Sequence, residues 1–142
     1  MLKKQTKASL YKKNILIIIP SLSGGGAEKI ASNLANLFKK NNFKVEIICI
    51  YKKSKINYKI NQDISIQYLN CKKVSGSILE LRKLLKSKDN TIIISFLTIT
   101  NICIALSNIF LKKKNIFIYT QHEIPSKTFH KIFPLRKSIF IK

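Results

Sequence analysis

Residues 14–20 read Asn14-Ile-Leu-Ile-Ile-Ile-Pro20, and residues 21–28 continue as Ser21-Leu-Ser-Gly-Gly-Gly-Ala-Glu28. The first segment is a short apolar run that ends at a proline, which is typical of a buried strand. The glycines of the second segment predict a turn into a helix. Such a helix points its first backbone N–H groups and the positive end of its dipole at one place. The two segments therefore predict a site for an anion, the alternative being a helix-entry turn without a ligand.

The helix expected after the glycines is amphipathic. Its apolar residues recur at spacings of three and four, and the expected inner face consists of Ala27, Ile30, Ala31, Leu34, Ala35, Leu37 and Phe38. Glu28 lies in the first turn and Lys39-Lys40 in the last, as the helix dipole favours. Residues 43–50 predict a second strand, so this part of the chain forms a parallel strand-helix-strand unit.

The rest of the chain continues the alternation of strands and helices. Residues 51–61 are rich in lysine and show no period, which predicts a loop, and residues 64–69 alternate as a strand does. Residues 75–88 predict a helix whose inward residues are Ile78, Leu81, Leu84 and Leu85. A chain of 142 residues has room for one core. We therefore expect one α/β domain, with a Rossmann-like, mostly parallel sheet and flanking helices.

Residues 91–111 contain no charged side chain and precede Lys112-Lys113-Lys114, so a membrane-spanning helix must be considered. Polar residues are scattered through this segment, however. A strand over 91–96, a loop and a helix explain the pattern better. The residues expected on the inner face of that helix are Ile102, Ala105, Leu106 and Ile109.

Two common phosphate-binding motifs do not fit the glycines. The dinucleotide fingerprint needs a glycine where Lys29 stands, and an acidic residue after the second strand, where the chain reads Tyr51-Lys52-Lys53. These lysines suit a negative group better than a ribose hydroxyl. A Walker-type loop needs a Gly-Lys-Ser/Thr ending, which is absent from the sequence.

The charge balance is strongly basic, with 27 basic and 6 acidic residues and a formal net charge of +21. All the basic residues except Arg82 and Arg136 are lysines, which lack the fork that reads guanine. The lysines are also spread along the chain, so a solvated surface explains them better than nucleic-acid binding does. The excess charge also favours an anionic membrane surface as a partner.

The segments outside the expected domain core are basic. We place an N-terminal extension at residues 1–13, the domain at 14–126 and an amphipathic tail at 127–142. The tail has helically spaced apolar residues among lysines, which fits either a membrane surface or packing on the domain core. No export signal is recognisable, so the three cysteines are expected to be reduced thiols in the cytoplasm, with Cys49 and Cys103 in the core.

Several segments together resemble the N-terminal, acceptor-side domain of family 4 glycosyltransferases, which have the two-domain GT-B architecture. The matching segments are Ile15–Pro20, Gly25–Glu28, Lys44–Ile48, Ile92–Thr98 with Asn101, and Ile116–His122 with Pro125. The resemblance covers the chain from about residue 14 onward. It implies transfer of a sugar from a nucleotide-sugar donor to a cell-surface glycan or a lipid-linked acceptor, without a metal or other cofactor.

The expected site lies at the carboxyl ends of the strands, where open α/β sheets bind ligands. The glycines Gly24, Gly25 and Gly26, with Glu28, are the expected donor residues for the phosphate or sugar, although Glu28 also fits a role as a partner of the helix dipole. The expected acceptor-side residues are Ser95, Thr98, Asn101, Gln121 and Glu123. The resemblance implies that His122 holds a sugar hydroxyl or relays a proton, which makes it the candidate catalytic residue.

One part of the family pattern is missing. The resemblance implies a second domain with two glutamates separated by seven residues, and no two of the six acidic residues have that spacing. We therefore expect the donor-binding domain to be absent from this chain, or supplied by a partner subunit, and the isolated polypeptide to be inactive. The alternative is a non-catalytic interaction module of the same fold, which acts with a partner subunit or at a membrane surface.

Overall fold

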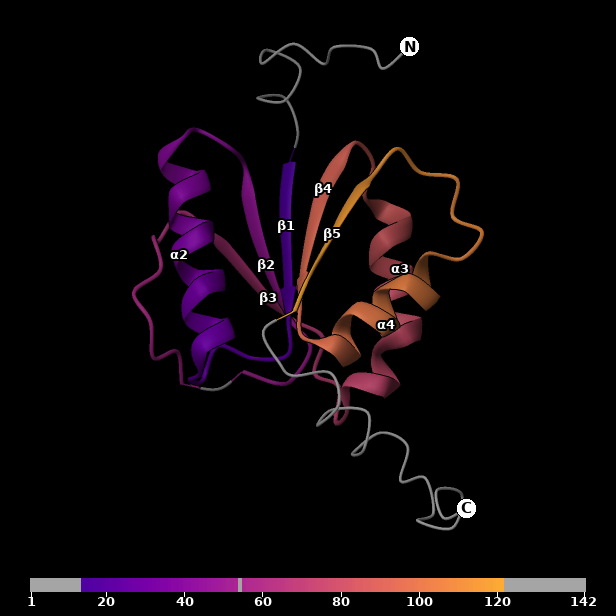
Figure 1. The fold of residues 1–142 in the computed structure, drawn as a ribbon, viewed down its shortest axis with the longest axis horizontal. Coiled ribbons are helices and arrows are strands. Elements are labelled where there is room, and N and C mark those ends of the chain that lie inside the picture. Colours follow the sequence, from indigo (N-terminus) through magenta and orange to yellow (C-terminus); the bar gives the residue numbers. More distant parts are fainter. Residues whose placement is uncertain (1–13, 54, 122–142) are drawn as a thin grey trace, which may run out of the picture.

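The computed structural model describes residues 14–53 and 55–121, and its helices and strands alternate along the chain (Figure 1). The order is β1 (Asn14–Ile19), α2 (Gly26–Lys40), β2 (Val45–Cys49), β3 (Ser65–Tyr68), the 3-10 turn η1 (Val74–Ser77), α3 (Ile78–Ser87), β4 (Thr91–Phe96), α4 (Thr98–Asn108) and β5 (Ile116–Thr120). The predicted extension at 1–13, the tail at 127–142, His122 and Glu123 lie outside the described residues.

The described strands form one parallel sheet in the order β3-β2-β1-β4-β5. β1 is central: Ile17 is paired with Ile47 of β2 on one side and with Ile94 of β4 on the other. The chain builds the sheet outward from β1 in one direction and then returns to continue from β4 in the other. This confirms the predicted α/β class, and it places a topological switch point between β1 and β4.

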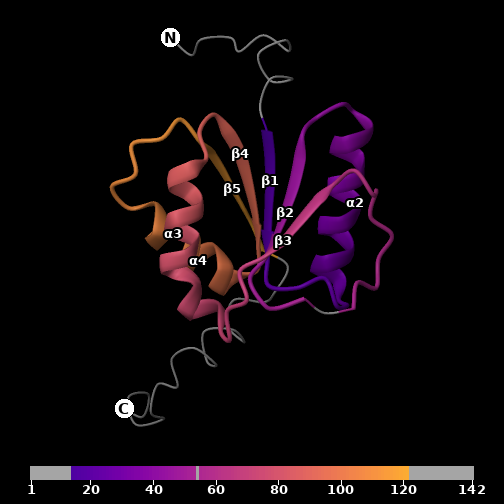
Figure 2. The ribbon, with the colours of Figure 1, turned by 180° about the vertical axis from the view of Figure 1, so that it is seen from behind.

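Helices cover both faces of the sheet, with α2 on one face and α3 and α4 on the other (Figures 1 and 2). Alternate residues of β1 supply the two cores: Ile15, Ile17 and Ile19 pack toward α2, and Leu16 and Ile18 pack toward α3 and α4. A strand that is buried on both faces reads as a continuous apolar run. This is why residues 15–19 were recognisable in the sequence.

The inner face of α2 is narrower than predicted. The alanines Ala27, Ala31 and Ala35 are buried against the sheet, whereas Ile30 is 45% exposed and Leu37 is 54% exposed. The inward prediction was therefore wrong for Ile30 and Leu37. Small side chains on the contact stripe let the helix lie close to the sheet, and the larger residues at the edges of the stripe are left partly in solvent.

α4 faces the opposite way from the prediction. Its buried residues are Thr98, Thr100, Cys103, Ile104 and Ser107, and the residues expected inside, Ile102, Ala105, Leu106 and Ile109, are exposed. The cause lies in the contact with α3, where the Ser107 hydroxyl lies 2.9 Å from the carbonyl oxygen of Ile78. Small and hydroxyl side chains permit this close helix contact, so the larger apolar residues point outward.

The segment considered as a membrane span, residues 91–111, is divided between β4 and α4, as expected. Among the described residues, no helix has both the length and the apolar character needed to cross a membrane.

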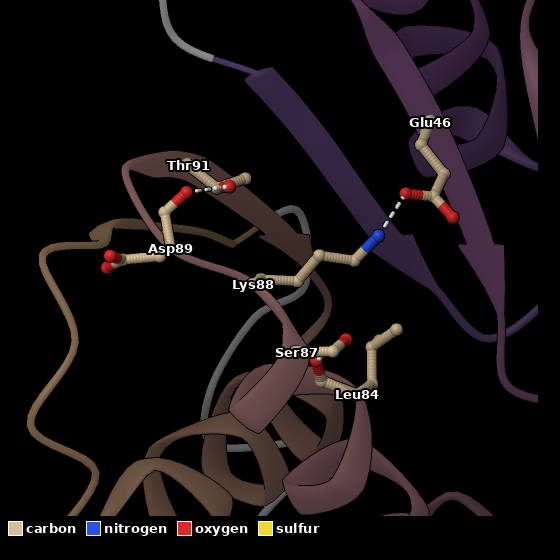
Figure 3. A network of polar contacts seen from close by, with 6 residues as sticks. All are labelled: Glu46, Leu84, Ser87, Lys88, Asp89 and Thr91. Atoms are coloured by element: carbon tan, nitrogen blue, oxygen red, sulfur yellow. Dashed lines mark hydrogen bonds and ion pairs between the residues drawn. The ribbon is translucent and has the colours of Figure 1, made fainter.

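Polar contacts fix the turn between α3 and β4 (Figure 3). Lys88 follows the last residue of α3 and forms an ion pair with Glu46 of β2. The Ser87 hydroxyl donates to the Leu84 carbonyl oxygen at 2.8 Å, and the Thr91 hydroxyl donates to the Asp89 carbonyl oxygen at 2.9 Å. These contacts stabilise the amino edge of the sheet, the edge opposite the strand ends that carry the expected site.

Candidate functional site

A pocket of about 550 Å³ lies at the switch point between β1 and β4. It is lined by Gly24, Gly25, Gly26, Ala27, Glu28, Ile30 and Leu97. The glycine loop after β1 and the start of α2 form one side, and the residue that follows β4 forms the other. The predicted donor residues thus lie together, in the position where open α/β sheets bind ligands.

The backbone of the glycine loop needs glycine. Gly24 and Gly25 have φ angles of 141° and 143°, which side-chain-bearing residues rarely adopt. A Cβ atom at Gly25 would also overlap the carboxylate of Glu28. The Glu28 carboxylate therefore lies directly against the loop, beside a helix N-terminus that has no side-chain cap. Such a carboxylate can accept hydrogen bonds from hydroxyl groups in the pocket.

The loop between β2 and β3 holds the glycine loop in place. The Gly25 N–H donates to the Tyr58 hydroxyl oxygen at 2.8 Å, and the Tyr58 O–H donates to the Gly25 carbonyl oxygen at 2.7 Å. The Asn57 side-chain amide donates to the Ser23 carbonyl oxygen. Tyr58 therefore occupies the Gly25 N–H, which is not open to a ligand. Nothing in the aperiodic segment 51–61 had indicated these contacts.

Leu97 has a strained backbone at the pocket wall. Its φ angle is 76°, a value that costs a non-glycine residue on the order of 1–3 kcal/mol. The residue follows β4 directly, precedes the first residue of α4 and packs against the core on the α2 side. Strain of this kind is concentrated at functional sites, so Leu97 joins the candidate residues, as a pocket-lining side chain that sequence patterns could not reveal.

The predicted acceptor-side residues form a polar network at the ends of β4 and β5. The Ser95 hydroxyl lies 2.6 Å from the Asn101 Oδ1 atom, and Asn101 Nδ2 donates to the Thr120 carbonyl oxygen at 2.9 Å. The Thr120 hydroxyl donates to the Ser95 carbonyl oxygen at 2.8 Å, and Gln121 Nε2 donates to the Thr98 hydroxyl at 3.1 Å. Ser95 is 1% exposed. Ser95 and Asn101 thus connect β4, α4 and β5, and the buried Ser95 is not open to a ligand.

Across residues 14–53 and 55–121, no three His, Cys, Asp or Glu side chains lie close enough to hold an ion together. The predicted catalytic residue His122 and its neighbour Glu123 directly follow the last described residue, Gln121, which lies at the carboxyl end of β5.

No known family model matches the chain, and a search of curated proteins finds no significant match.

Proposed function

We propose that this domain binds a nucleotide sugar in the pocket between the glycine loop and Leu97, as the N-terminal part of a glycosyltransferase. The observation that carries the proposal is the position of that pocket at the switch point, with Gly24, Gly26 and Glu28 on one wall. Further support comes from the resemblance of the strand, the glycine loop and the helix to family 4 glycosyltransferases. The acceptor in this proposal is a cell-surface glycan or a lipid-linked sugar.

Each residue of the wall has a role suited to its chemistry. The N–H groups of Gly24 and Gly26 approach the diphosphate, which benefits from the positive end of the α2 dipole. The Glu28 carboxylate accepts hydrogen bonds from sugar hydroxyls. Tyr58 holds the loop in the bound shape through its two hydrogen bonds with Gly25. During transfer, negative charge develops on the departing diphosphate, and preorganised N–H donors stabilise such charge.

The test is binding of nucleotide sugars to the full chain, followed by NMR of the backbone amides. UDP-glucose and GDP-mannose are suitable first probes, each compared with its nucleoside diphosphate alone. We expect saturable shifts at Gly24, Gly26 and Leu97 with at least one probe. Titration with a broader panel of nucleotide sugars without such shifts would refute donor binding by this domain.

Glu28→Gln distinguishes binding of the sugar from binding of the nucleoside diphosphate. Loss of a charge-assisted hydrogen bond to a sugar hydroxyl weakens binding of the nucleotide sugar about tenfold. Binding of the nucleoside diphosphate without sugar is not weakened, because the substitution removes a negative charge beside the phosphates. Glu80→Gln is the matched control, because Glu80 also lies in the first turn of a helix and is paired with Lys83. Equal loss of sugar and diphosphate binding in Glu28→Gln would contradict the assigned role.

A second candidate function is a non-catalytic interaction module of the same fold. The observation that favours it is the outward apolar face of α4, where Ile102, Leu106 and Ile109 are each more than 40% exposed. Under this function, no nucleotide sugar shifts the glycine amides. For either function we propose a cytoplasmic location, next to an anionic membrane surface where the acceptor is lipid-linked.

A further inference from the structure

A second pocket, of about 730 Å³, lies at the carboxyl ends of β2 and β3. It is lined by Tyr51, Lys52, Asn70, Cys71 and Lys72, none of which lines the pocket at the switch point. The first two residues come shortly after β2, and the other three come shortly after β3. This pocket therefore opens at the same ligand-binding edge of the sheet as the first.

The backbone that carries the pocket is firmly held. The Tyr51 N–H donates to the Pro20 carbonyl oxygen at 2.9 Å, and the Cys71 N–H donates to the Ile50 carbonyl oxygen at 2.9 Å. These bonds extend the contacts between neighbouring strands past the ends of the sheet. Asn70 has a φ of 57°, a conformation that asparagine tolerates better than most residues. The side chains of the pocket are thus presented from fixed backbone positions.

Two of the residues that line the pocket, Lys52 and Lys72, are positively charged. The ion pairs found within the described residues join Lys39 to Asp63, Lys83 to Glu80 and Lys88 to Glu46. None of them involves Lys52 or Lys72. Lys52 and Lys72 line the same pocket and form no close ion pair within the described part of the chain, so the pocket favours an anion, although the Glu80 carboxylate lies near Cys71.

The other lining groups complement an anion. Burial raises the pKa of the Cys71 thiol, and the nearby Glu80 carboxylate raises it further, so the thiol is neutral and adds no negative charge. The Asn70 amide supplies two N–H donors. The Tyr51 ring is 36% exposed and offers an apolar surface to the organic part of a ligand.

We propose that this pocket is a second ligand site that binds a phosphate ester, with the phosphate between Lys52 and Lys72 and the organic part against Tyr51. Two features distinguish it from the many other lysines of the chain, namely its concave shape and its place at the strand ends. The site does not depend on nucleotide-sugar binding at the glycine loop.

The test uses the full chain with a hexose phosphate as the soluble probe and NMR of the backbone amides as the readout. Lys52→Gln/Lys72→Gln removes the two charges of the pocket. The matched control is Lys86→Gln/Lys112→Gln, which removes two exposed lysines near the opposite edge of the sheet. Circular dichroism checks that both double variants are folded.

In the wild type, we expect saturable shifts at Tyr51 and Asn70 while the amides of the glycine loop stay unchanged. The pocket variant is expected to bind at least about tenfold more weakly, because each lysine contributes a charge-assisted hydrogen bond, and the control should stay within about twofold. A non-saturable response spread over lysines of the whole surface, or an equal loss in both variants, would overturn the proposal.

A second arm identifies the source of the phosphate. Vesicles of phosphatidylcholine with and without phosphatidic acid are sedimented with the wild type and both variants. If the phosphate belongs to a lipid headgroup, only the pocket variant loses sedimentation with the phosphatidic acid vesicles. If it belongs to a soluble ester, both variants sediment alike and the hexose phosphate alone distinguishes them. Loss of neither kind of binding in the pocket variant would refute the site.

Discussion

Asn101→Ala is expected to destabilise the domain more than other substitutions at the edge of the sheet would. Asn101 Oδ1 lies 2.6 Å from the Ser95 hydroxyl, and Asn101 Nδ2 donates to the Thr120 carbonyl oxygen at 2.9 Å. Each bond contributes about 1 kcal/mol net, and a buried hydroxyl left without its partner costs about 1–3 kcal/mol. Ser95 is 1% exposed, so its hydroxyl loses this partner in a buried position. The free energy of unfolding should therefore fall by about 2–4 kcal/mol.

A double-mutant cycle with Ser95→Ala isolates the shared bond. Ser95→Ala removes the hydroxyl together with its need for a partner, so it should cost only about 1 kcal/mol. Ser95→Ala/Asn101→Ala should then cost less than the sum of the single changes by about 1 kcal/mol. Asn108→Ala is the control on the same helix, because no hydrogen bond of the Asn108 side chain is found within the described residues.

Urea denaturation followed by far-ultraviolet circular dichroism measures these differences, since the chain has no tryptophan. An unchanged dependence on urea concentration shows that the variants unfold from equally compact states. Asn101→Ala within about 0.5 kcal/mol of the wild type, or strictly additive changes in the cycle, would refute the structural role of this network.

Gly25→Ala should lower the free energy of unfolding by about 1–3 kcal/mol, because alanine is strained at its φ of 143°. Gly76→Ala, with open space around it, is the control in the same urea assay. Glu46→Gln breaks the part-buried ion pair with Lys88, so the variant should be less stable than the wild type and its stability should depend less on salt concentration. Equal melting temperatures of the wild type and the variant at both low and high salt would contradict this. Burial raises the pKa of the Cys49 thiol from 9.0 to about 12, so the stability that comes from keeping this thiol neutral is complete below pH 9 and is lost as the pH rises toward 12. Alkylation at mildly alkaline pH should therefore modify Cys49 only after unfolding. Rapid labelling of Cys49 in the native protein would contradict its burial.

The sequence predicted the secondary structure best where burial alone determined the residue types. β4 was predicted at Thr91–Phe96 and is found there, because a strand buried on both faces must be apolar along its length. The facing of α4 could not be predicted in the same way. Periodicity finds an apolar stripe, but it does not indicate that a stripe containing Thr98, Cys103 and Ser107 packs more closely against α3. The interior of α4 was therefore assigned to the wrong residues.

The candidate site was predictable only in its local parts. The glycines and Glu28 form a continuous segment between a strand and a helix, so the strand-end rule identified them directly. Tyr58 is 33 residues from its partner Gly25, and such pairings leave no local pattern. The strained φ of Leu97 likewise has no signature, because leucine rarely adopts it.

Because β1 is the central strand, one of its edges stays unpaired while the rest of the chain is being synthesised. β1 is made well before β4, yet the register joins Ile15 to Ile92 and Ile17 to Ile94. A ribosome that has not yet reached residue 91 therefore carries a nascent chain in which one edge of the most apolar strand is open. Open apolar edges pair readily with other chains, and distant strand pairings form slowly. Shortened chains that end before β4 should consequently aggregate on release.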